Sequence, residues 1–368
     1  MNSETDVIIV LGTRPEIIKL SPVIQACERR EIDYSIIHTG QHYSDSLDSV
    51  FFEQLELPTP EHHLGVGSGT HGEQTADMLV GVEQIICEEE PEVVLVQGDT
   101  NSVLAGALAT SKLDIKLGHV EAGLRSFDRE MPEETNRVVT DHVADYLFAP
   151  TEKSKESLLE EGISEAQITV TGNTVVDALY RNRELAEQKS TVLDDLGLVE
   201  GEFFLMTAHR AENVDDEERF DNLLAGVSNA AKQYGSEVVY PIHPRAESSL
   251  GEFDITVPDN IRLVEPQDYL DFLRLESAAK LILTDSGGVQ EEACVVGVPC
   301  VTMRDSTERP ETVTVGANRL SGVDPENIMT SVISMLEANE TWENPFGDGS
   351  AGQRILDEVV QTGQKVNL

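Results

Sequence analysis

The strongest constraint on the fold is the regular alternation of short apolar runs with helical patterns along the whole chain. In the first half the apolar runs are DVIIVLG (6–12), residues 34–38, VVLVQG (93–98), YLFAP (146–150) and ITVTGN (168–173). Apolar residues occupy successive positions in these runs, as expected for strands that are covered on both faces. The pattern predicts a parallel sheet with helices on both sides, a doubly wound α/β domain.

The same pattern restarts after a polar stretch at residues 181–201. Its apolar runs are FFLMTAH (203–209), VVYPIH (238–243), IRLVE (261–265), KLILTDS (280–286) and PCVTM (299–303). A chain of 368 residues is too long for one ordinary core. We therefore predict two doubly wound Rossmann-like domains, residues 1–172 and 173–352, and a C-terminal helix at 353–368. The cleft between two such domains is a common ligand site.

The charge of the chain excludes one class of ligand. Acidic residues number 68 against 26 basic ones, a net charge of −42, so we expect no nucleic-acid partner. The acids are spread over many predicted helices, and only nine of the basic residues are lysines. Diffuse acidity with scarce lysine indicates adaptation to a high-salt cytoplasm, in which salt screens self-repulsion. The alternative is an ordinary acidic protein.

Cysteine spacing and hydropathy indicate a cytoplasmic protein. Cys27, Cys87, Cys294 and Cys300 are far apart and have the spacing neither of metal ligands nor of a disulfide framework. We expect reduced, buried, unreactive thiols and no bound metal. No apolar run approaches the roughly 18 residues of a membrane-spanning helix. The N-terminus has no basic segment ahead of its apolar run, so we expect neither a signal peptide nor a membrane partner.

A dense cluster of charges follows the apolar run that ends at Val120. From Glu121 to Arg137 the chain has five acids and three arginines within seventeen residues. Open α/β proteins bind ligands at the carboxyl ends of their strands, so a site is expected here. Most charge runs are solvated loops, and for this segment taken alone that interpretation stays open.

Two more strand ends of the first domain carry charged side chains. Arg14 and Lys19, in and after GTRPE (12–16), place cations near the end of the sheet, where an arginine can bind phosphate or carboxylate. Asp99, in QGDTNS (97–102), is either an acid at the mouth of the sheet or the cap of the next helix. Neither motif decides between a site and a surface turn by itself.

Histidine 209 and Arg210 stand at the corresponding place in the second domain, after its first strand. A histidine at the carboxyl end of a strand can act as an acid, a base or a phosphate donor. A lone histidine is more often structural.

The segment TDSGGVQEEA (284–293) is the most specific motif. A strand ends, and Gly287 and Gly288 open the next helix. Backbone N–H groups at a helix N-terminus bind anions, and glycine lets the anion approach closely. Glu292 can accept hydrogen bonds from ribose hydroxyls, and Arg309 adds a cation for a diphosphate. These residues predict a nucleotide site, with acid/base carboxylates in the other domain.

One glycine pattern is misleading. Gly67, Gly69 and Gly72 satisfy GxGxxG, the dinucleotide fingerprint, which requires a strand immediately before it. The preceding residues are PTPEHHLGV, so we predict a flexible loop and no nicotinamide cofactor.

Taken in order, several segments resemble one family. They are GTRPEIIKLSP, QGDTNSVLAGALA, HVEAGLRSFDREMPEETNR, GNTVVDAL, TAHRAEN and LTDSGGVQEEA followed by GVPCVTMRDSTERPE. From about residue 6 to residue 360 the chain closely resembles the non-hydrolysing UDP-N-acetylglucosamine 2-epimerases, and GSGTHGEQT resembles their archaeal branch. The resemblance implies the glycosyltransferase-B fold, with two Rossmann-like domains facing across a cleft. It also implies a C-terminal helix that returns to the first domain, and a homodimer.

That family interconverts UDP-GlcNAc and UDP-ManNAc, sugars for cell-surface polysaccharides. The C2 proton is not beside a carbonyl, so direct abstraction would be very slow. The family instead expels UDP from C1 while C2 loses its proton, which forms 2-acetamidoglucal, and then adds UDP back with the opposite configuration at C2. This reaction needs a base on each face of C2 and stabilisation of the departing diphosphate, but no cofactor.

The resemblance also implies roles for residues of this chain. The acid/base residues match Asp99, Glu121 and Glu133, with His209 near the diphosphate. The contacts to UDP match Arg14, Lys19, Gln267, Phe272, Ser286, Gly287, Gly288, Glu292 and Arg309. A second, activating UDP-GlcNAc site of bacterial relatives matches Gln41, His42, Arg210 and His243. Many of those relatives carry a second arginine where this chain has Ala211.

Three other functions share parts of the pattern. A hydrolysing epimerase would release ManNAc and UDP, and a glycosyltransferase of the same fold would require an acceptor. A nucleotide-sugar sensor without activity is disfavoured, because every matched catalytic position is filled.

The charge imbalance predicts that salt stabilises the fold. Raising NaCl from about 0.1 M to about 1 M shortens the Debye length from about 10 Å to about 3 Å and so screens repulsion among the acids. We expect the thermal midpoint, followed by circular dichroism, to rise by several degrees, with KCl acting as NaCl does. A midpoint that stays constant or falls would contradict the high-salt interpretation.

Overall fold

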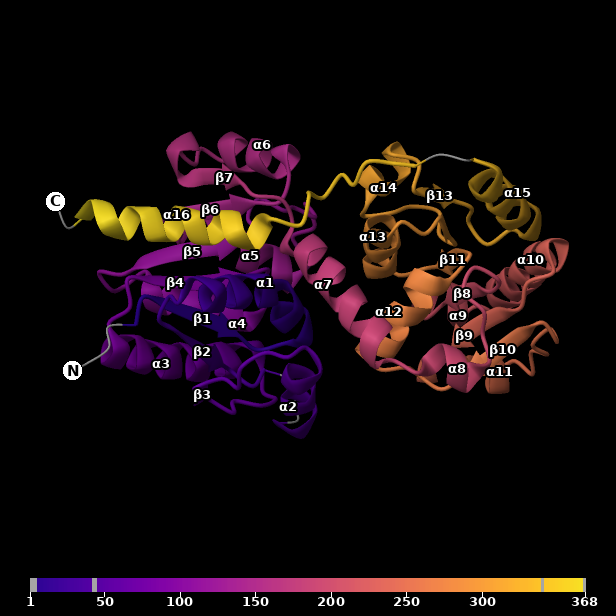
Figure 1. Ribbon diagram of the computed structural model, residues 1–368, viewed down its shortest axis with the longest axis horizontal. Coiled ribbons are helices and arrows are strands. Elements are labelled where there is room, and N and C mark those ends of the chain that lie inside the picture. The colour runs from indigo at the N-terminus through magenta and orange to yellow at the C-terminus, as the bar shows by residue number, and fades with distance from the viewer. Residues whose placement is uncertain (1–4, 42–44, 339–340, 367–368) are drawn as a thin grey trace. The chain divides into compact units, whose positions relative to one another are not determined.

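The chain forms two compact units. The computed structural model describes residues 5–41, 45–338 and 341–366. One unit comprises the chain up to Ala178 together with the chain from Phe346 onward, and the other spans Leu179–Pro345. Each is built on one parallel sheet flanked by helices (Figure 1). The prediction of two doubly wound α/β units is confirmed.

The first unit contains a seven-stranded sheet in the order β3-β2-β1-β4-β5-β6-β7. Its strands are β1 (Val7–Leu11), β2 (Tyr34–His38), β3 (His62–His63), β4 (Val93–Gln97), β5 (Lys116–Val120), β6 (Tyr146–Ala149) and β7 (Ile168–Val170). Its helices are α1 (Arg14–Arg30), α2 (Asp45–Gln54), α3 (His71–Glu89), α4 (Asn101–Thr110), α5 (Pro132–Val143), α6 (Glu152–Glu160), the short 3-10 helix η1 (Glu165–Gln167), the start of α7 (Thr174–Lys189), and α16 (Ala351–Val366).

The second unit contains a six-stranded sheet in the order β10-β9-β8-β11-β12-β13. Its strands are β8 (Phe204–Thr207), β9 (Val238–Pro241), β10 (Ile261–Val264), β11 (Leu281–Thr284), β12 (Cys300–Thr302) and β13 (Asn318–Leu320). Besides the rest of α7, its helices are α8 (Val192–Leu196), α9 (Ala211–Val214), α10 (Glu217–Tyr234), α11 (Pro244–Glu252), α12 (Tyr269–Ala278), α13 (Gly287–Val296), α14 (Pro310–Thr314) and α15 (Pro325–Glu337).

Both sheets reverse their strand order at one point. In the first unit the reversal falls between β1 and β4, and in the second between β8 and β11. Loops that follow the two strands at a reversal leave the sheet toward opposite faces, which opens a crevice at the carboxyl ends of the strands. Each unit therefore has one preferred place for a ligand.

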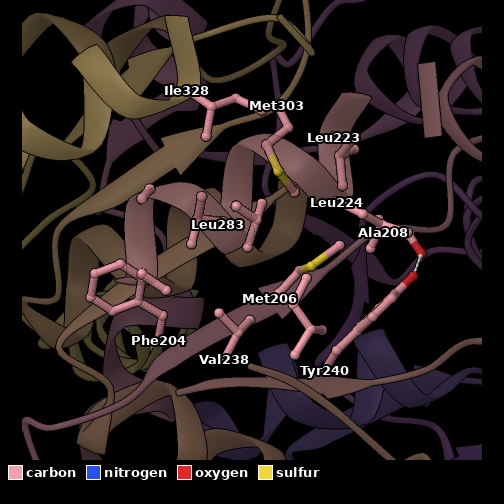
Figure 2. Close-up of a cluster of buried hydrophobic side chains, with 14 of the residues drawn as sticks. Phe204, Met206, Ala208, Leu223, Leu224, Val238, Tyr240, Leu283, Met303 and Ile328 are labelled. Carbon is pink, nitrogen blue, oxygen red and sulfur yellow. Dashed lines mark hydrogen bonds between the residues drawn. The ribbon is translucent and has the colours of Figure 1, made fainter. Parts of the chain in front are cut away.

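The core of the second unit reaches its strand-end loop. Figure 2 shows Phe204 and Met206 of β8 packed among Tyr240 of β9 and Leu283 of β11, all fully buried. The Tyr240 hydroxyl donates a hydrogen bond to the carbonyl of Ala208, at 2.6 Å. This bond satisfies a buried polar group and holds the backbone directly before His209.

The C-terminal helix belongs to the first unit. Helix α16, yellow in Figure 1, packs against α1. Its first N–H groups, at Ala351 and Gly352, donate to the Asp177 carboxylate at 3.2 and 3.0 Å. Gly352 approaches the Pro22 backbone so closely that a Cβ there would lie 2.8 Å from the Pro22 carbonyl. A small residue is therefore required at this crossing.

All four cysteines are free thiols, and Cys27, Cys294 and Cys300 are buried. Cys87, which we expected to be buried, is exposed. The buried face of α3 carries Ile85 and Ile86, and Cys87 falls on the opposite, solvent-facing side. Across the described chain, no helix has the length and apolar character needed to cross a membrane.

The substitution Gly352→Ala tests the contact between α16 and α1. The added methyl must displace the helix from Pro22, so we expect a loss of about 1–3 kcal/mol in the free energy of unfolding, measured with urea. Gly72→Ala in α3 is the matched control, because no atom lies within 4 Å of a Cβ built there. It should be neutral or stabilising by up to about 1 kcal/mol. Equal effects of the two changes would contradict the close approach.

Candidate active site

Three adjacent strands of the first unit end beside one another and carry predicted site residues. Lys19 lies on the helix that follows β1, Asp99 lies two residues beyond β4, and Glu121 directly follows β5. Because β4 pairs in parallel with both β1 and β5, these residues meet at one edge of the sheet. The edge coincides with the reversal of strand order.

Glu121 is the most tightly held of the predicted acids. Its side chain is 6% exposed, and both carboxylate oxygens lie 2.7 Å from the Lys19 ammonium. The Gln97 amide also donates to it. A contacting ammonium favours the charged carboxylate, which is the form that accepts a proton. The backbone of Glu121 is left-handed, with φ +70°, a conformation that costs a non-glycine residue about 1–3 kcal/mol and concentrates at functional sites.

Asp99 is not the cap of the following helix. Thr100 is the N-cap of α4, and its hydroxyl accepts from the N–H of Val103. The Asp99 carboxylate instead contacts the guanidinium of Arg137, and its carbonyl accepts from the Asn136 amide at 2.8 Å. Helix α5 therefore reaches across to the loop after β4 and holds the second predicted acid.

The contact with Arg137 was not anticipated from the sequence. The sequence pattern predicts that this arginine is part of the loop scaffold, a contact to the sugar or part of a dimer surface. Arg137 also pairs with Glu134, three residues earlier, at 2.6 Å. That i,i+3 spacing is visible in PEETNR, but the sequence carries no signal for its second partner on another loop.

Glu133 and Glu134 are neighbours on α5 with different surroundings. The Glu134 carboxylate accepts from the N–H groups of Ser126 and Phe127. Burial raises its pKa, but these bonds and Arg137 outweigh burial and the pKa lies below its usual value. Glu134 thus shapes the loop. Glu133 is half-buried and has no side-chain hydrogen bond or ion pair within the described residues, which leaves its carboxyl available for proton transfer.

Glu16, in the GTRPE motif, ties two strand-end loops together. Its side chain is buried, and its carboxylate accepts from the Gly12 N–H at 2.9 Å and from the Thr100 hydroxyl at 2.6 Å. Burial raises the pKa of Glu16 to about 7, although these hydrogen bonds lower it. The loops after β1 and β4 are therefore fixed by one buried acid that the sequence did not single out.

In the second unit, Asp285 holds the predicted site residues together. In the sequence this residue was visible only as part of the strand end KLILTDS (280–286). Its carboxylate is wholly buried and accepts from the N–H groups of His209 and Arg210, both at 2.9 Å, and from the Asn213 amide at 3.2 Å. Its other oxygen lies 3.0 Å from Nδ1 of His209. Burial raises the pKa of Asp285, but His209 and the N–H groups lower it further than burial raises it. The pairing fixes the half-exposed His209 ring.

The glycine-rich motif forms the helix start that the sequence predicted. Helix α13 begins at Gly287, and the hydroxyl of its N-cap residue Ser286 makes no capping hydrogen bond to the described chain. The first N–H groups of a helix lack intrahelical acceptors and attract anions. Glu292 lies one turn further on and borders the fully buried Glu276. Arg309 contacts the Glu291 carboxylate at 3.1 Å.

The remaining predicted contacts to UDP are spread over both units. In the first unit, the exposed Arg14 guanidinium lies over the Phe51 ring, 6.0 Å from its centroid. In the second unit, the Gln267 amide donates to the Glu265 carbonyl at 2.6 Å, and Phe272 packs partly buried against the core.

The residues matched to a second nucleotide-sugar site are only partly described. The Gln41 side chain accepts from the N–H of Ser102 at 3.0 Å, at the start of α4. His243 caps α11, and its ring centroid lies 5.8 Å from that of His209. Arg210 follows His209 at the N-cap of α9. His42 lies outside the described residues.

A cavity of about 570 Å³ in the first unit lies between the first turns of α3, α4 and α5. It reaches the Asp99 loop through Asn101 and Asn136, but Asp99, Glu121 and Glu133 do not line it. The carboxylates therefore gather at the strand ends and not in this cavity.

Two doubly wound units, with carboxylates at the reversal of one sheet and a glycine-rich helix start in the other, define a nucleotide-sugar enzyme of the glycosyltransferase-B class. The family model described as UDP-N-acetylglucosamine 2-epimerase matches residues 25–360. The UDP-N-acetylglucosamine 2-epimerase of Methanocaldococcus jannaschii is 54% identical over 354 residues, which cover 95% of this chain and 97% of that protein.

Solved structures agree with the sequence match. The structure of UDP-GlcNAc 2-epimerase from Methanocaldococcus jannaschii superposes with a TM-score of 0.91 at 52% identity, covering 97% of this chain and 100% of that one. A crystal structure of the epimerase from this organism in complex with UDP-GlcNAc and UDP superposes with a TM-score of 0.81 at 53% identity. It also covers 97% of this chain and 100% of that one. The chain belongs to the UDP-N-acetylglucosamine 2-epimerase family, as its motifs predicted.

Replacing Glu16 by Gln tests the buried acid. The carboxyl has an ordinary pKa of 4.5 and a pKa of about 7 in the folded protein, so the folded state binds more protons between these values. Wild-type stability therefore falls through this window as pH rises, by about 3 kcal/mol, and Glu16→Gln lacks this loss. Urea unfolding at about pH 5 and about pH 8 measures the difference. A stability difference between the two proteins that does not change with pH would contradict the raised pKa.

Proposed function

We propose that this protein interconverts UDP-GlcNAc and UDP-ManNAc, by eliminating UDP to give 2-acetamidoglucal and adding it back with C2 inverted. The observation that carries the proposal is a relative at 53% identity, solved with UDP-GlcNAc and UDP, that matches the chain over 97% of its length. The strand-end carboxylates of the first unit supply the acid/base groups that this reaction needs.

The proposed reaction balances without an added reactant. A carboxylate takes the proton from C2, the C1–O bond breaks, and UDP leaves with the bonding electrons. The C1–C2 double bond of 2-acetamidoglucal remains. In the second half, a carboxyl group delivers a proton to the opposite face of C2 and the diphosphate oxygen attacks C1. No electrons are gained or lost overall, so no redox cofactor is required.

The three acids of the first unit differ in ways that suit this division of work. Glu121 is held by Lys19, and Asp99 is held by Arg137, so both carboxyl groups have a fixed position from which to accept a proton. Glu133, without a cation partner in the described chain, can carry the proton in one direction and release it in the other.

The second unit holds the nucleotide in this proposal. The start of α13, at Ser286, Gly287 and Gly288, binds the diphosphate, and Glu292 accepts from the ribose hydroxyls. His209, oriented by Asp285, donates to the departing diphosphate. Further contacts to UDP are proposed for Arg14, Lys19, Gln267, Phe272 and Arg309.

Two further parts of the proposal concern binding. Gln41, Arg210 and His243 would contribute to a second UDP-GlcNAc site, in a form altered by the alanine at position 211. The protein would act as a homodimer in the cytoplasm. Exposed apolar side chains in the first unit, Val80 and Phe127 among them, support an interface there.

Turnover in D₂O tests the reaction. Incubation with UDP-GlcNAc should give UDP-ManNAc with deuterium at C2, detected by proton NMR and mass spectrometry, and no free sugar. Stoichiometric ManNAc and UDP would instead establish a hydrolysing epimerase. No turnover until an acceptor is added would favour a glycosyltransferase.

The same assay tests the three acids. Asp99→Asn, Glu121→Gln and Glu133→Gln should each slow deuterium exchange at C2 by about 10²–10⁴-fold, the usual contribution of a general acid or base. Glu130→Gln is the matched control, because Glu130 is exposed in the same segment, and it should exchange at the wild-type rate. Unchanged exchange in any of the first three variants would remove that residue from the mechanism.

A further inference from the structure

His119 is a buried histidine between two predicted catalytic loops. It lies on β5, and its side chain is 0% exposed. Nδ1 lies 2.6 Å from a carboxylate oxygen of Asp141 on α5, and Nε2 lies 2.8 Å from the carbonyl oxygen of Gly98. Both ring nitrogens are thus engaged at hydrogen-bond distance.

The two partners determine which nitrogens carry hydrogen. A backbone carbonyl can only accept, so Nε2 must donate to Gly98. The Asp141 carboxylate takes the Gly123 N–H at 3.2 Å and the Arg125 guanidinium at 2.7 Å on its other oxygen. Burial raises the pKa of Asp141, but His119 and Arg125 outweigh burial and lower it. Asp141 is therefore held as a carboxylate between the His119 ring and Arg125.

The ring stands at one end of a row of paired groups. Arg125, whose side chain is 2% exposed, binds Asp141 on one side and Glu161, the C-cap of α6, on the other, both at 2.7 Å. His119, Asp141, Arg125 and Glu161 are thus connected side chain to side chain. Buried ions are retained only where each is paired and hydrogen-bonded, and this arrangement meets that condition.

The row ends on the backbone that carries the predicted acids. Gly98 immediately precedes Asp99 and has a left-handed backbone, with φ +86°. Its N–H donates to the Val120 carbonyl at 3.1 Å, directly before Glu121. The Gly123 N–H, held by Asp141, lies just beyond Glu121. His119 and Asp141 thereby fix the chain around both acids.

We propose that His119 is a positioning residue, which sets the backbone of Asp99 and Glu121 through its bonds to Gly98 and Asp141. It does not touch the reacting atoms. The inference rests on the proposed function, because it assigns His119 a part in placing the acid/base groups of that reaction.

Replacing His119 by Gln or by Asn tests its two hydrogen bonds separately. The Gln amide nitrogen can occupy the place of Nε2 and keep the donor to Gly98, whereas the shorter Asn amide can occupy the place of Nδ1 and keep only the donor to Asp141. We expect kcat for UDP-GlcNAc epimerisation to fall by about 10²-fold in His119→Asn and by about tenfold in His119→Gln, since small misplacements of catalytic groups have effects of this size. KM should change by no more than about threefold, because the change acts on the reacting groups and not on nucleotide binding.

His142 provides the control. It follows Asp141 on α5, its side chain is 45% exposed, and among the described residues its Nδ1 contacts the Val138 carbonyl and, at 3.8 Å, Glu161. His142→Asn and His142→Gln should keep wild-type kcat and thermal midpoint. If the two His119 variants instead lose kcat equally and in proportion to their loss of thermal midpoint, His119 is a core residue only and the inference is overturned.

An NMR measurement on the wild-type protein tests the state of the His119 ring independently of stability and activity. Long-range proton–nitrogen correlation spectra of histidine labelled with ¹⁵N should show one ring whose Nε2 carries a hydrogen that exchanges slowly with water, because that nitrogen is buried and bonded to the Gly98 carbonyl. That signal should be absent from His119→Gln. A His119 ring without a hydrogen on Nε2 in an active epimerase overturns this inference alone, whereas a wild-type protein with no epimerase activity overturns the proposed function.

Discussion

Parallel pairing in register is the constraint on which the candidate site residues of each unit depend. In the first unit Gln97 of β4 stands opposite Val120 of β5, so the residues that follow, among them Asp99 and Glu121, leave the sheet side by side. In the second unit Thr207 of β8 stands opposite Thr284 of β11, which brings His209 against Asp285. A shift of one residue in either pairing would exchange the faces of one strand and separate these groups.

Each unit secures its strand-end loops with buried carboxylates that bind backbone N–H groups. Glu16 holds Gly12, Asp141 holds Gly123, and Asp285 holds His209 and Arg210. Charge-assisted hydrogen bonds are about twice as strong as neutral ones, and a buried carboxylate left without them is costly. Loops in these positions therefore have few alternative conformations. This rigidity suits a reaction in which proton donors and acceptors must face C2 within a fraction of an ångström.

The two doubly wound domains were predictable because apolar runs report burial locally, whereas the glycosyltransferase-B arrangement was implied by the family resemblance. Five consecutive buried residues in β1 and in β4 require cover on both faces, whatever their partners are. The glycine-rich start of α13 was predictable for the same reason, since Gly287 and Gly288 signal a helix start that a ligand can approach. Long-range contacts gave no such signal. Arg137 and Asp99 are 38 residues apart, and His119 and Gly98 are 21 residues apart, so no short sequence spacing indicates either contact.

The sequence by itself determined the two parallel sheets, the order of their elements, the family and the types of residue at each strand end. All of these follow from hydrophobic period and short motifs, which act within one element. The tertiary structure alone decided which acids have a cation beside them, which carboxylates are buried and bind backbone, and that Cys87 faces solvent. The physical reason is that charge state and hydrogen bonding depend on distances between strands that are far apart in the chain. The segment after Val120 shows the difference, because its eight charges look alike in sequence and take separate roles in the fold.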